Sequence, residues 1–503
     1  MSQPITSLSP AFAKRVDMLR ALIREPTPYK KYLGRSLDSL QADYFNASEL
    51  MNYLLEAQRL LHIHLLGVQD DEEIFAFYTS NAVRSWYQMK SPPAEPDLMQ
   101  GLADQVYNMR TGMNDYAFIQ TDDGVRKVVE IITERLVLEK HPFDVQFRDG
   151  DVRARLFHAA KEEGVRRLAQ YHLDVWAPVT RRMAVVPGMV PNADAPPAPE
   201  NNRLFEELTA PVFEKISKGD IHFTLTRIPT KLDADVDEVP YEDYLTLFFE
   251  MCDQPWEQIS QAHNHLIKRL NADKDLHFTN SDGTDLRMSI EGMTFASSLT
   301  ARNVPGSEVF SAPLLESVEG KIVAKGLFVP PGTRGRVIRD ITLEFKDGKC
   351  IAHDAVEGKD LLTRQLKKDE GSARIGEVGI GTNPHLRRHV SNGLLVEKIG
   401  GSFHVALGRA YQMTDYVGQP VKLDNGNRSR IHWDITTMLQ GKEGRIEVDG
   451  ESLMEEGLFL DPALEVLNKG WEAIPVAERP DYWKEYDFAA AYEKQRATKL
   501  KTA

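Results

Sequence analysis

One short segment in the C-terminal half carries the residue types that bind divalent metal ions. In SRIHWDIT, His432 and Asp434 are separated by a single residue. Alternate residues of a strand project from one face, so the two side chains can meet one ion together. On its own such a pair is more often an ordinary surface pair, so its interpretation depends on the segments that accompany it.

Two further segments supply that context. HVALGRAY contains His404 and Tyr411, and Glu377 lies in IGEVGIGTN, which we predict to be a glycine-rich turn whose backbone can approach a ligand closely. The glycines lack the spacing of a dinucleotide-binding loop, which disfavours a phosphate site. Two-metal hydrolysis needs a bridging carboxylate, oxygen and imidazole ligands on both ions, and a shared water whose pKa the metals lower. The C-terminal half contains such a set.

Four sequence blocks occur in order: NVPGSEVFSAP at 303–313, ARIGEVGIGTN at 373–383, GSFHVALGRAY at 401–411 and NRSRIHWDITTML at 427–439. With supporting matches at 228–244 and 283–292, they resemble in order and spacing the thermophilic-type metalloaminopeptidases, the family of aminopeptidase T and aminopeptidase S. The resemblance extends over roughly residues 227–439, which is under half of the chain.

The resemblance implies a set of metal ligands and an activity. The implied ligands are Glu308, Glu377, His404, Tyr411, His432 and Asp434, with Glu377 linking the two ions. The implied activity is removal of N-terminal amino acids from peptides with a free N-terminus, by a homodimer that binds two divalent ions such as zinc or cobalt.

Either Glu308 or Glu397 could transfer the catalytic proton, and the sequence does not decide between them. We rank Glu308 first as a metal ligand and expect Glu397 to contact the ligands rather than the ions. One departure from the family lies at this point, because its usual Asp-Glu-Asn is replaced here by Val396-Glu397-Lys398. Contacts to the substrate are therefore expected to differ from those of the family.

Two alternative functions follow from these observations. The altered segment suggests a related metallohydrolase that acts on a non-peptide amide or a modified natural product. A non-catalytic metal-dependent binding protein is the other alternative, and the intact ligand types disfavour it. Three further histidine pairs are expected to be structural or on the surface. His62 and His64 lie in an amphipathic apolar run, His263 and His265 lie in a charged helix, and His385 and His389 lack the partner glutamate of an HExxH site.

Composition limits the partners and the compartment. The formal net charge of -14 disfavours nucleic acid as a partner, because phosphate binding needs a concentrated cationic surface. Cys252 and Cys350 cannot form a disulfide framework, which favours a reducing compartment. No secretory signal or membrane-spanning stretch is recognised, so we expect a cytoplasmic protein without a membrane partner.

The length of 503 residues predicts two or three domains. We expect an α+β or α/β multidomain fold: a mixed α/β N-terminal region over 1–216, with a proline-rich linker near 186–202, and a mainly β metal-binding domain over 217–503 with a helical tail. Apolar periodicity predicts helices at 46–87, 124–138, 152–173 and 241–272, and strands at 143–147 and 221–229. ITLEFKDGKCIAHDAV predicts a hairpin with Asp347-Gly348 at its tip.

Overall fold

The computed structural model describes residues 156–188 and 199–497, apart from 332, 334 and 335, together with shorter pieces between residues 58 and 147. Most of the predicted helices at 46–87 and 124–138, and most of the proline-rich stretch at 186–202, lie outside the described residues. Within the described part, no helix combines the length and the apolar character needed to cross a membrane. The chain divides into two compact units, the first ending at Ile228 and the second made mainly of Pro229–Ala503.

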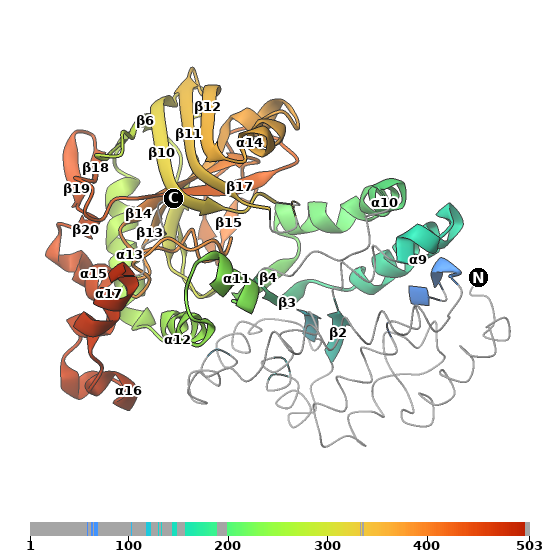
Figure 1. The fold of residues 1–503 in the computed structure, drawn as a ribbon, viewed down its shortest axis with the longest axis horizontal. Coiled ribbons are helices and arrows are strands. Elements are labelled where there is room, and N and C mark those ends of the chain that lie inside the picture. The colour runs from blue at the N-terminus through green and yellow to red at the C-terminus, as the bar shows by residue number, and fades with distance from the viewer. Residues whose placement is uncertain are drawn as a thin grey trace. The chain divides into compact units, whose positions relative to one another are not determined.

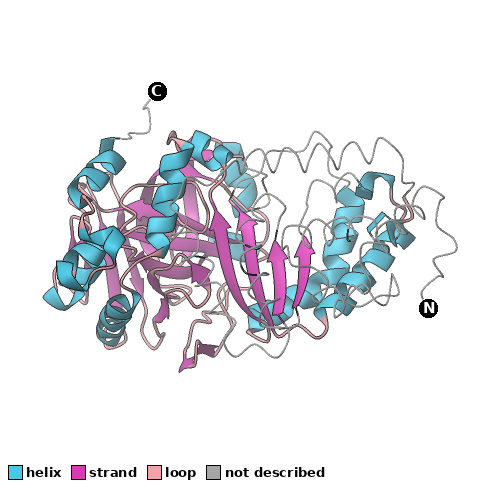
Figure 2. Ribbon diagram, turned by 90° about the horizontal axis from the view of Figure 1, so that it is seen from below, coloured by secondary structure: helices cyan, strands magenta, loops and turns pink. Residues whose placement is uncertain are grey.

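The first unit contains parallel strands in the order β2-β1-β3-β4, which lie side by side and point the same way (Figure 2). Its elements are β1 (Ala117–Thr121), β2 (Phe143–Phe147), α9 (Glu162–Trp176), β3 (Arg181–Pro187), α10 (Pro199–Lys218) and β4 (His222–Ile228). Parallel neighbours need a crossover connection, which α10 supplies between β3 and β4. The predicted strands at 143–147 and 221–229 are confirmed. The predicted domain boundary at 216–217 stays a prediction, because a compact unit is not necessarily an independently folding domain.

The second unit is built mainly from two antiparallel sheets. One has the strand order β12-β11-β10-β6-β5-β18-β19-β20 and the other the order β17-β14-β13-β9-β7. The strands of the first are β5 (Asp275–Thr279), β6 (Asp285–Ser289), β10 (Glu319–Phe328), β11 (Ile338–Lys346), β12 (Lys349–Glu357), β18 (Arg445–Val448), β19 (Glu451–Glu455) and β20 (Leu458–Phe459). The strands of the second are β7 (Ala296–Ser298), β9 (Glu308–Ser311), β13 (Ile375–Gly381), β14 (Ser402–Gly408) and β17 (His432–Met438).

The predicted hairpin is confirmed as β11 and β12. Asp347 has a φ of 49° and Gly348 a φ of 71°, and two successive residues with positive φ form the type of turn that matches the twist of antiparallel strands. Helix α14 (Lys359–Leu366) lies against both strands of the hairpin (Figure 1).

One apolar core lies between the two sheets. It contains Phe278 and Ile341 of the larger sheet and Phe403, Val405 and Ile435 of the smaller sheet, all fully buried. The smaller sheet therefore has one face committed to this core, and its other face is available for polar side chains.

Helices complete the second unit. The apolar residues of α13 recur at helical spacing, and Ile259, Ala262, Leu266 and Leu270 are buried in the same core, as predicted for 241–272. The remaining elements are α11 (Lys231–Val236), α12 (Tyr241–Cys252), α13 (Trp256–Leu270), α15 (Glu465–Lys469), α16 (Asp481–Lys484), α17 (Phe488–Ala497) and the short strands β8 (Asn303–Val304), β15 (Asp415–Tyr416) and β16 (Gln419–Pro420).

Candidate metal centre

Five of the six predicted ligands lie on the smaller sheet. Glu308 begins β9, Glu377 lies in β13, His404 lies in β14, and His432 and Asp434 lie in β17. The sixth, Tyr411, follows the end of β14. The sheet order places β17, β14, β13 and β9 next to one another, so residues far apart in the sequence are brought together.

The register of the sheet puts the first three ligands on one face. Glu308 pairs with Gly381, and His404 pairs with Gly379. Because paired residues share a face and alternate residues of a strand share a face, Glu308 and His404 project from the same side as Glu377.

The same register adds the ligands of β17. Ala406 of β14 pairs with both Glu377 and Asp434, and Gly408 pairs with His432. All five strand ligands therefore share one face, and the positions between them are occupied by glycine or alanine. This face has room between its polar side chains.

The prediction of a glycine-rich turn around Glu377 was wrong, because IGEVGIG is the buried strand β13. The glycines serve close packing. A Cβ on Gly379 would lie 2.2 Å from His404 Cε1, and a Cβ on Gly376 would lie 2.1 Å from the Gly408 carbonyl oxygen. Gly379 thus makes the space that the His404 ring occupies, and Gly376 lies where the pairing of β13 with β14 shifts register.

The donor atoms form two groups that share Glu377. One group is Glu308, Glu377 and His404, the other is Glu377, His432 and Asp434, and in each group the donor atoms lie within 4.8 Å of one another. Glu377 Oε1 lies 3.3 Å from His404 Nε2, and Glu377 Oε2 lies 3.4 Å from His432 Nε2. The two oxygens of Glu377 face different imidazoles, an arrangement that suits a carboxylate shared by two donor groups.

The outer donors complete each group. Glu308 Oε2 lies 3.5 Å from His404 Nε2, and Asp434 Oδ1 lies 3.6 Å from His432 Nε2. Within the described part of the chain, Glu308 Oε2, Glu377 Oε2 and Asp434 Oδ1 are buried and have no hydrogen-bond partner. Buried carboxylate oxygens without partners are costly, and bound cations would satisfy them.

The imidazole of His432 is oriented for a ligand. Its Nδ1 lies 2.8 Å from the Arg409 carbonyl oxygen and donates its proton there. This bond leaves the lone pair on Nε2, the atom that faces Glu377 and Asp434, and metal-binding histidines are commonly fixed in this way. The donor set and its orientation therefore fit divalent ions.

Tyr411 lies beside the second group. Its ring centroid is 5.2 Å from that of His432 and 5.7 Å from that of Phe310. Burial, together with the nearby carboxylates, raises the pKa of Tyr411 well above its ordinary value. The structure brings this ring to the site, and a role for its hydroxyl as a ligand stays a prediction.

Glu397 and Lys398 join the site from the segment that precedes β14. The ammonium of Lys398, whose side chain is 0% exposed, donates to Glu308 Oε1 and, at 2.7 Å, to Glu397 Oε2. In the sequence, Lys398 stands out only as a departure from the family pattern. Its position between Val396 and Ile399, beside a predicted ligand block, was the available sign that this lysine is buried.

These contacts determine the electrostatics of the site. Burial raises the pKa of Glu308 to about 6, although Lys398 opposes the shift. Burial acts to raise the pKa of Glu397, but Lys398, His404 and a hydrogen bond with Asp434 together lower that pKa below its ordinary value. Burial and the neighbouring carboxylate of Glu397 raise the pKa of Asp434 well above its ordinary value. Lys398 therefore helps to keep Glu397 ionised.

Burial would lower the pKa of Lys398, but the carboxylates of Glu308 and Glu397 raise it above its ordinary value. Burial would likewise lower the pKa of His404, and Glu377 and Glu308 raise it. The raised pKa values of Lys398 and His404 show that the carboxylates of this cluster favour positive charge.

The other histidines that the sequence offered belong to neither donor group. His263 contacts hydroxyl groups, His265 contacts Asp461, and His385 contacts Glu250. Among the described residues, only the two groups around Glu377 bring three candidate donors together. His64 lies outside the described residues.

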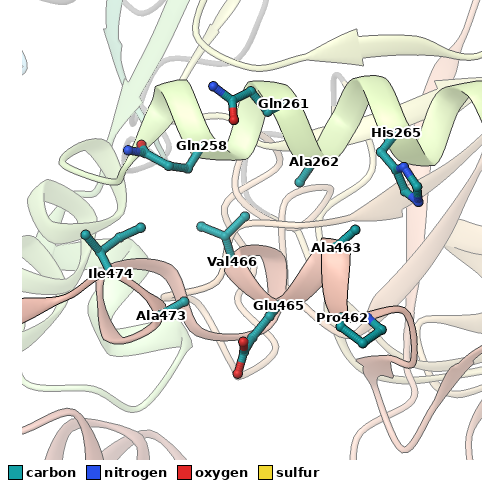
Figure 3. A pocket seen from close by; sticks show the side chains of 10 residues that line it. All are labelled: Gln258, Gln261, Ala262, His265, Pro462, Ala463, Glu465, Val466, Ala473 and Ile474. Atoms are coloured by element: carbon teal, nitrogen blue, oxygen red, sulfur yellow. The ribbon is translucent and has the colours of Figure 1, made fainter.

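The second unit also contains a pocket away from the donor groups. It has a volume of about 380 Å³ and lies between α13 and residues 462–474, and Figure 3 shows Gln258, Gln261 and His265 on its helical side. None of the six predicted ligands lines it. The donor groups on the sheet are therefore the stronger candidate for chemistry.

Comparison with known proteins matches the part of the chain that contains the donor groups. A family model described as thermophilic metalloprotease (M29) matches residues 102–459. The chain is 31% identical to aminopeptidase T of Thermus thermophilus over 219 residues, which cover 40% of this chain and 51% of that protein. It is 32% identical to aminopeptidase 2 of Geobacillus stearothermophilus over 128 residues, which cover 25% of this chain and 28% of that protein. The matched part thus spans about half the length of aminopeptidase T.

The fold is shared with a solved structure. The structure of wild-type AmpT from Thermus thermophilus matches with a TM-score of 0.56 and 22% sequence identity, covering 72% of this chain and 99% of that chain. At this sequence identity the match shows a shared fold, which mixes helices with several sheets.

Proposed function

Because the chain belongs to the M29 family of thermophilic metalloproteases, we propose that it is a metal-dependent aminopeptidase that releases N-terminal amino acids from peptides. The observation that carries the proposal is the position of Glu377. Its two carboxylate oxygens face His404 and His432 separately, and each histidine has a further carboxylate beside it.

In this proposal the two donor groups hold two divalent ions, zinc, cobalt or a similar metal. Glu308, Glu377 and His404 hold one ion, and Glu377, His432 and Asp434 hold the other. Tyr411 is proposed as an additional ligand, because its ring lies against His432. When bound, such ions would polarise a carbonyl group and lower the pKa of a water molecule.

The proton transfers are assigned to Glu397. Lys398 and burial act on it in opposite directions, and the net lowering of its pKa keeps it ionised and able to accept a proton from the attacking water. The same carboxyl group then returns the proton to the departing amine. Glu308 faces His404 as a donor, so we propose it as a ligand and no longer as an equal candidate for the base.

The proposed substrates are peptides with a free α-amino group, and the proposed form is a cytoplasmic homodimer. These points rest on the resemblance to the family and on the sequence composition.

The test uses chelated full-length protein assayed with a matched pair of peptides, one with a free amino terminus and one N-acetylated. Activity on the free peptide should be lost after chelation and return when zinc or cobalt is added. Efficient cleavage of the first bond of the acetylated peptide would contradict the proposal and favour a metallohydrolase acting on other amides. Metal binding without cleavage of either peptide would favour a binding protein.

A further inference from the structure

The two donor groups around Glu377 differ in one contact. Glu308 of the first group already holds a cation, because the buried ammonium of Lys398 donates to its Oε1. In the second group, Asp434 has no ion pair with a lysine or arginine among the described residues, and its carboxyl group hydrogen-bonds to Glu397 instead. An ion entering the first group must therefore approach a fixed positive charge, and an ion entering the second group need not.

The charge of the cluster points the same way. Four carboxylates and one ammonium lie together, namely those of Glu308, Glu377, Glu397, Asp434 and Lys398, which leaves a formal net charge of -3 with neutral imidazoles. One divalent ion removes most of this charge. A second divalent ion gives the buried cluster a net positive charge, which costs free energy because the site is shielded from water.

We propose that Lys398 makes the two ion positions unequal: the Glu377, His432 and Asp434 position binds the first divalent ion, and the Glu308, Glu377 and His404 position binds a second ion more weakly, in competition with the Lys398 ammonium. The inference rests on the metal site of the proposed function. Lys398 acts here as a positioning residue that neutralises Glu308 and sets the order in which the positions fill.

The experiment is calorimetric titration of the chelated full-length protein with zinc alone, with the bound metal counted by elemental analysis. Wild-type protein should show two binding steps of different affinity. Lys398→Met should tighten the weaker step by about 10- to 100-fold, the range typical for changes to partners of metal ligands. Lys398→Arg keeps the charge and should keep the two steps apart.

A matched control is Lys442→Met, because Lys442 forms an ion pair with Asp282 at 2.9 Å outside the cluster. It should bind zinc like the wild type. Two equal steps in wild-type protein, or an unchanged weaker step in a folded Lys398→Met variant, would overturn the inference.

If Lys398→Met fails to fold by circular dichroism, Glu308→Gln provides the second test. It removes a donor from the first group and leaves Lys398 paired with Glu397, so it should lose only the weaker ion. Retention of both ions at wild-type affinity would overturn the inference. The readout is metal binding. The inference can therefore fail while peptide hydrolysis is observed, and it can hold while no peptide is hydrolysed.

Discussion

Two histidines of the second unit, His263 and His404, are equally buried but differ in their hydrogen-bond partners and in the direction of their pKa shifts. His263 on α13 lies at 2.8 Å from the hydroxyl groups of Ser297, Ser307 and Thr382. His404 on β14 faces the carboxylates of Glu308 and Glu377. Burial lowers the pKa of His263 to about 3, whereas the carboxylates raise the pKa of His404 against the effect of burial.

The two environments are separated by a single step along the chain. Ser307 contacts His263, and the next residue, Glu308, contacts His404. Burial alone therefore does not identify a metal-binding histidine. The partners differ in kind, because the carboxylates around His404 favour positive charge whereas the hydroxyl groups around His263 satisfy a neutral ring.

The largest expected effect comes from Glu377→Gln, which removes the charge between the two donor groups. Both ions should be lost together, and the fall in kcat/KM should exceed the roughly 10² to 10⁴-fold contribution of general acid-base catalysis. The measurements are metal content and kcat/KM, with circular dichroism to exclude a folding defect.

Glu447→Gln is a suitable control for that variant, because Glu447 pairs with His277 at 2.9 Å outside the site. If Glu377→Gln retained both ions and near wild-type turnover, the assignment of the shared carboxylate would be wrong.

A smaller effect is expected from Glu397→Gln, because Glu397 contacts Lys398 and belongs to neither donor group. Metal content should stay near that of the wild type while kcat falls by about 10² to 10⁴-fold. Loss of metal from Glu397→Gln, with metal retained in Glu377→Gln, would exchange the roles of the two residues.

The smallest effect concerns His263 and appears in stability rather than in metal binding. Its pKa of about 3 in the folded protein lies below the value of about 6.5 expected in the unfolded chain. The folded state therefore favours the neutral ring, and this contribution is fully present above pH 6.5 and is lost as pH falls towards 3, by up to about 1.4 kcal/mol per pH unit.

Denaturant unfolding of chelated wild-type and His263→Gln proteins between about pH 7 and pH 4.5 checks this prediction. The free energy of unfolding should fall less steeply with decreasing pH in the variant. Metal content at neutral pH should be unchanged. Equal slopes in the two proteins would show that burial does not lower the pKa of His263.

The sequence predicted those features that depend on local pattern. The hairpin of β11 and β12 was predictable because Asp347-Gly348 supplies the positive φ that its tip needs. The shared face of His432 and Asp434 followed from strand periodicity. Both features need only a few neighbouring residues.

Features that depend on distant strands were not predictable. Nothing near Gly379 in the sequence shows that its missing side chain makes room for His404, so the glycines of β13 were assigned to a turn. Nothing near Lys398 shows that its ammonium reaches Glu308, which is 90 residues away. The pairing of Glu308 with Gly381 is likewise a property of the assembled sheet.

The carboxylate face of the smaller sheet also has a thermodynamic consequence. Its charges repel one another in the folded chain when no cation is bound, while the unfolded chain separates them in water. A divalent ion that binds only the folded state shifts the folding equilibrium by mass action, by about 2.7 kcal/mol when its free concentration is 100 times its dissociation constant. The melting temperature of this protein should therefore rise with the free metal concentration. Thermal unfolding would then report metal binding without any peptide substrate.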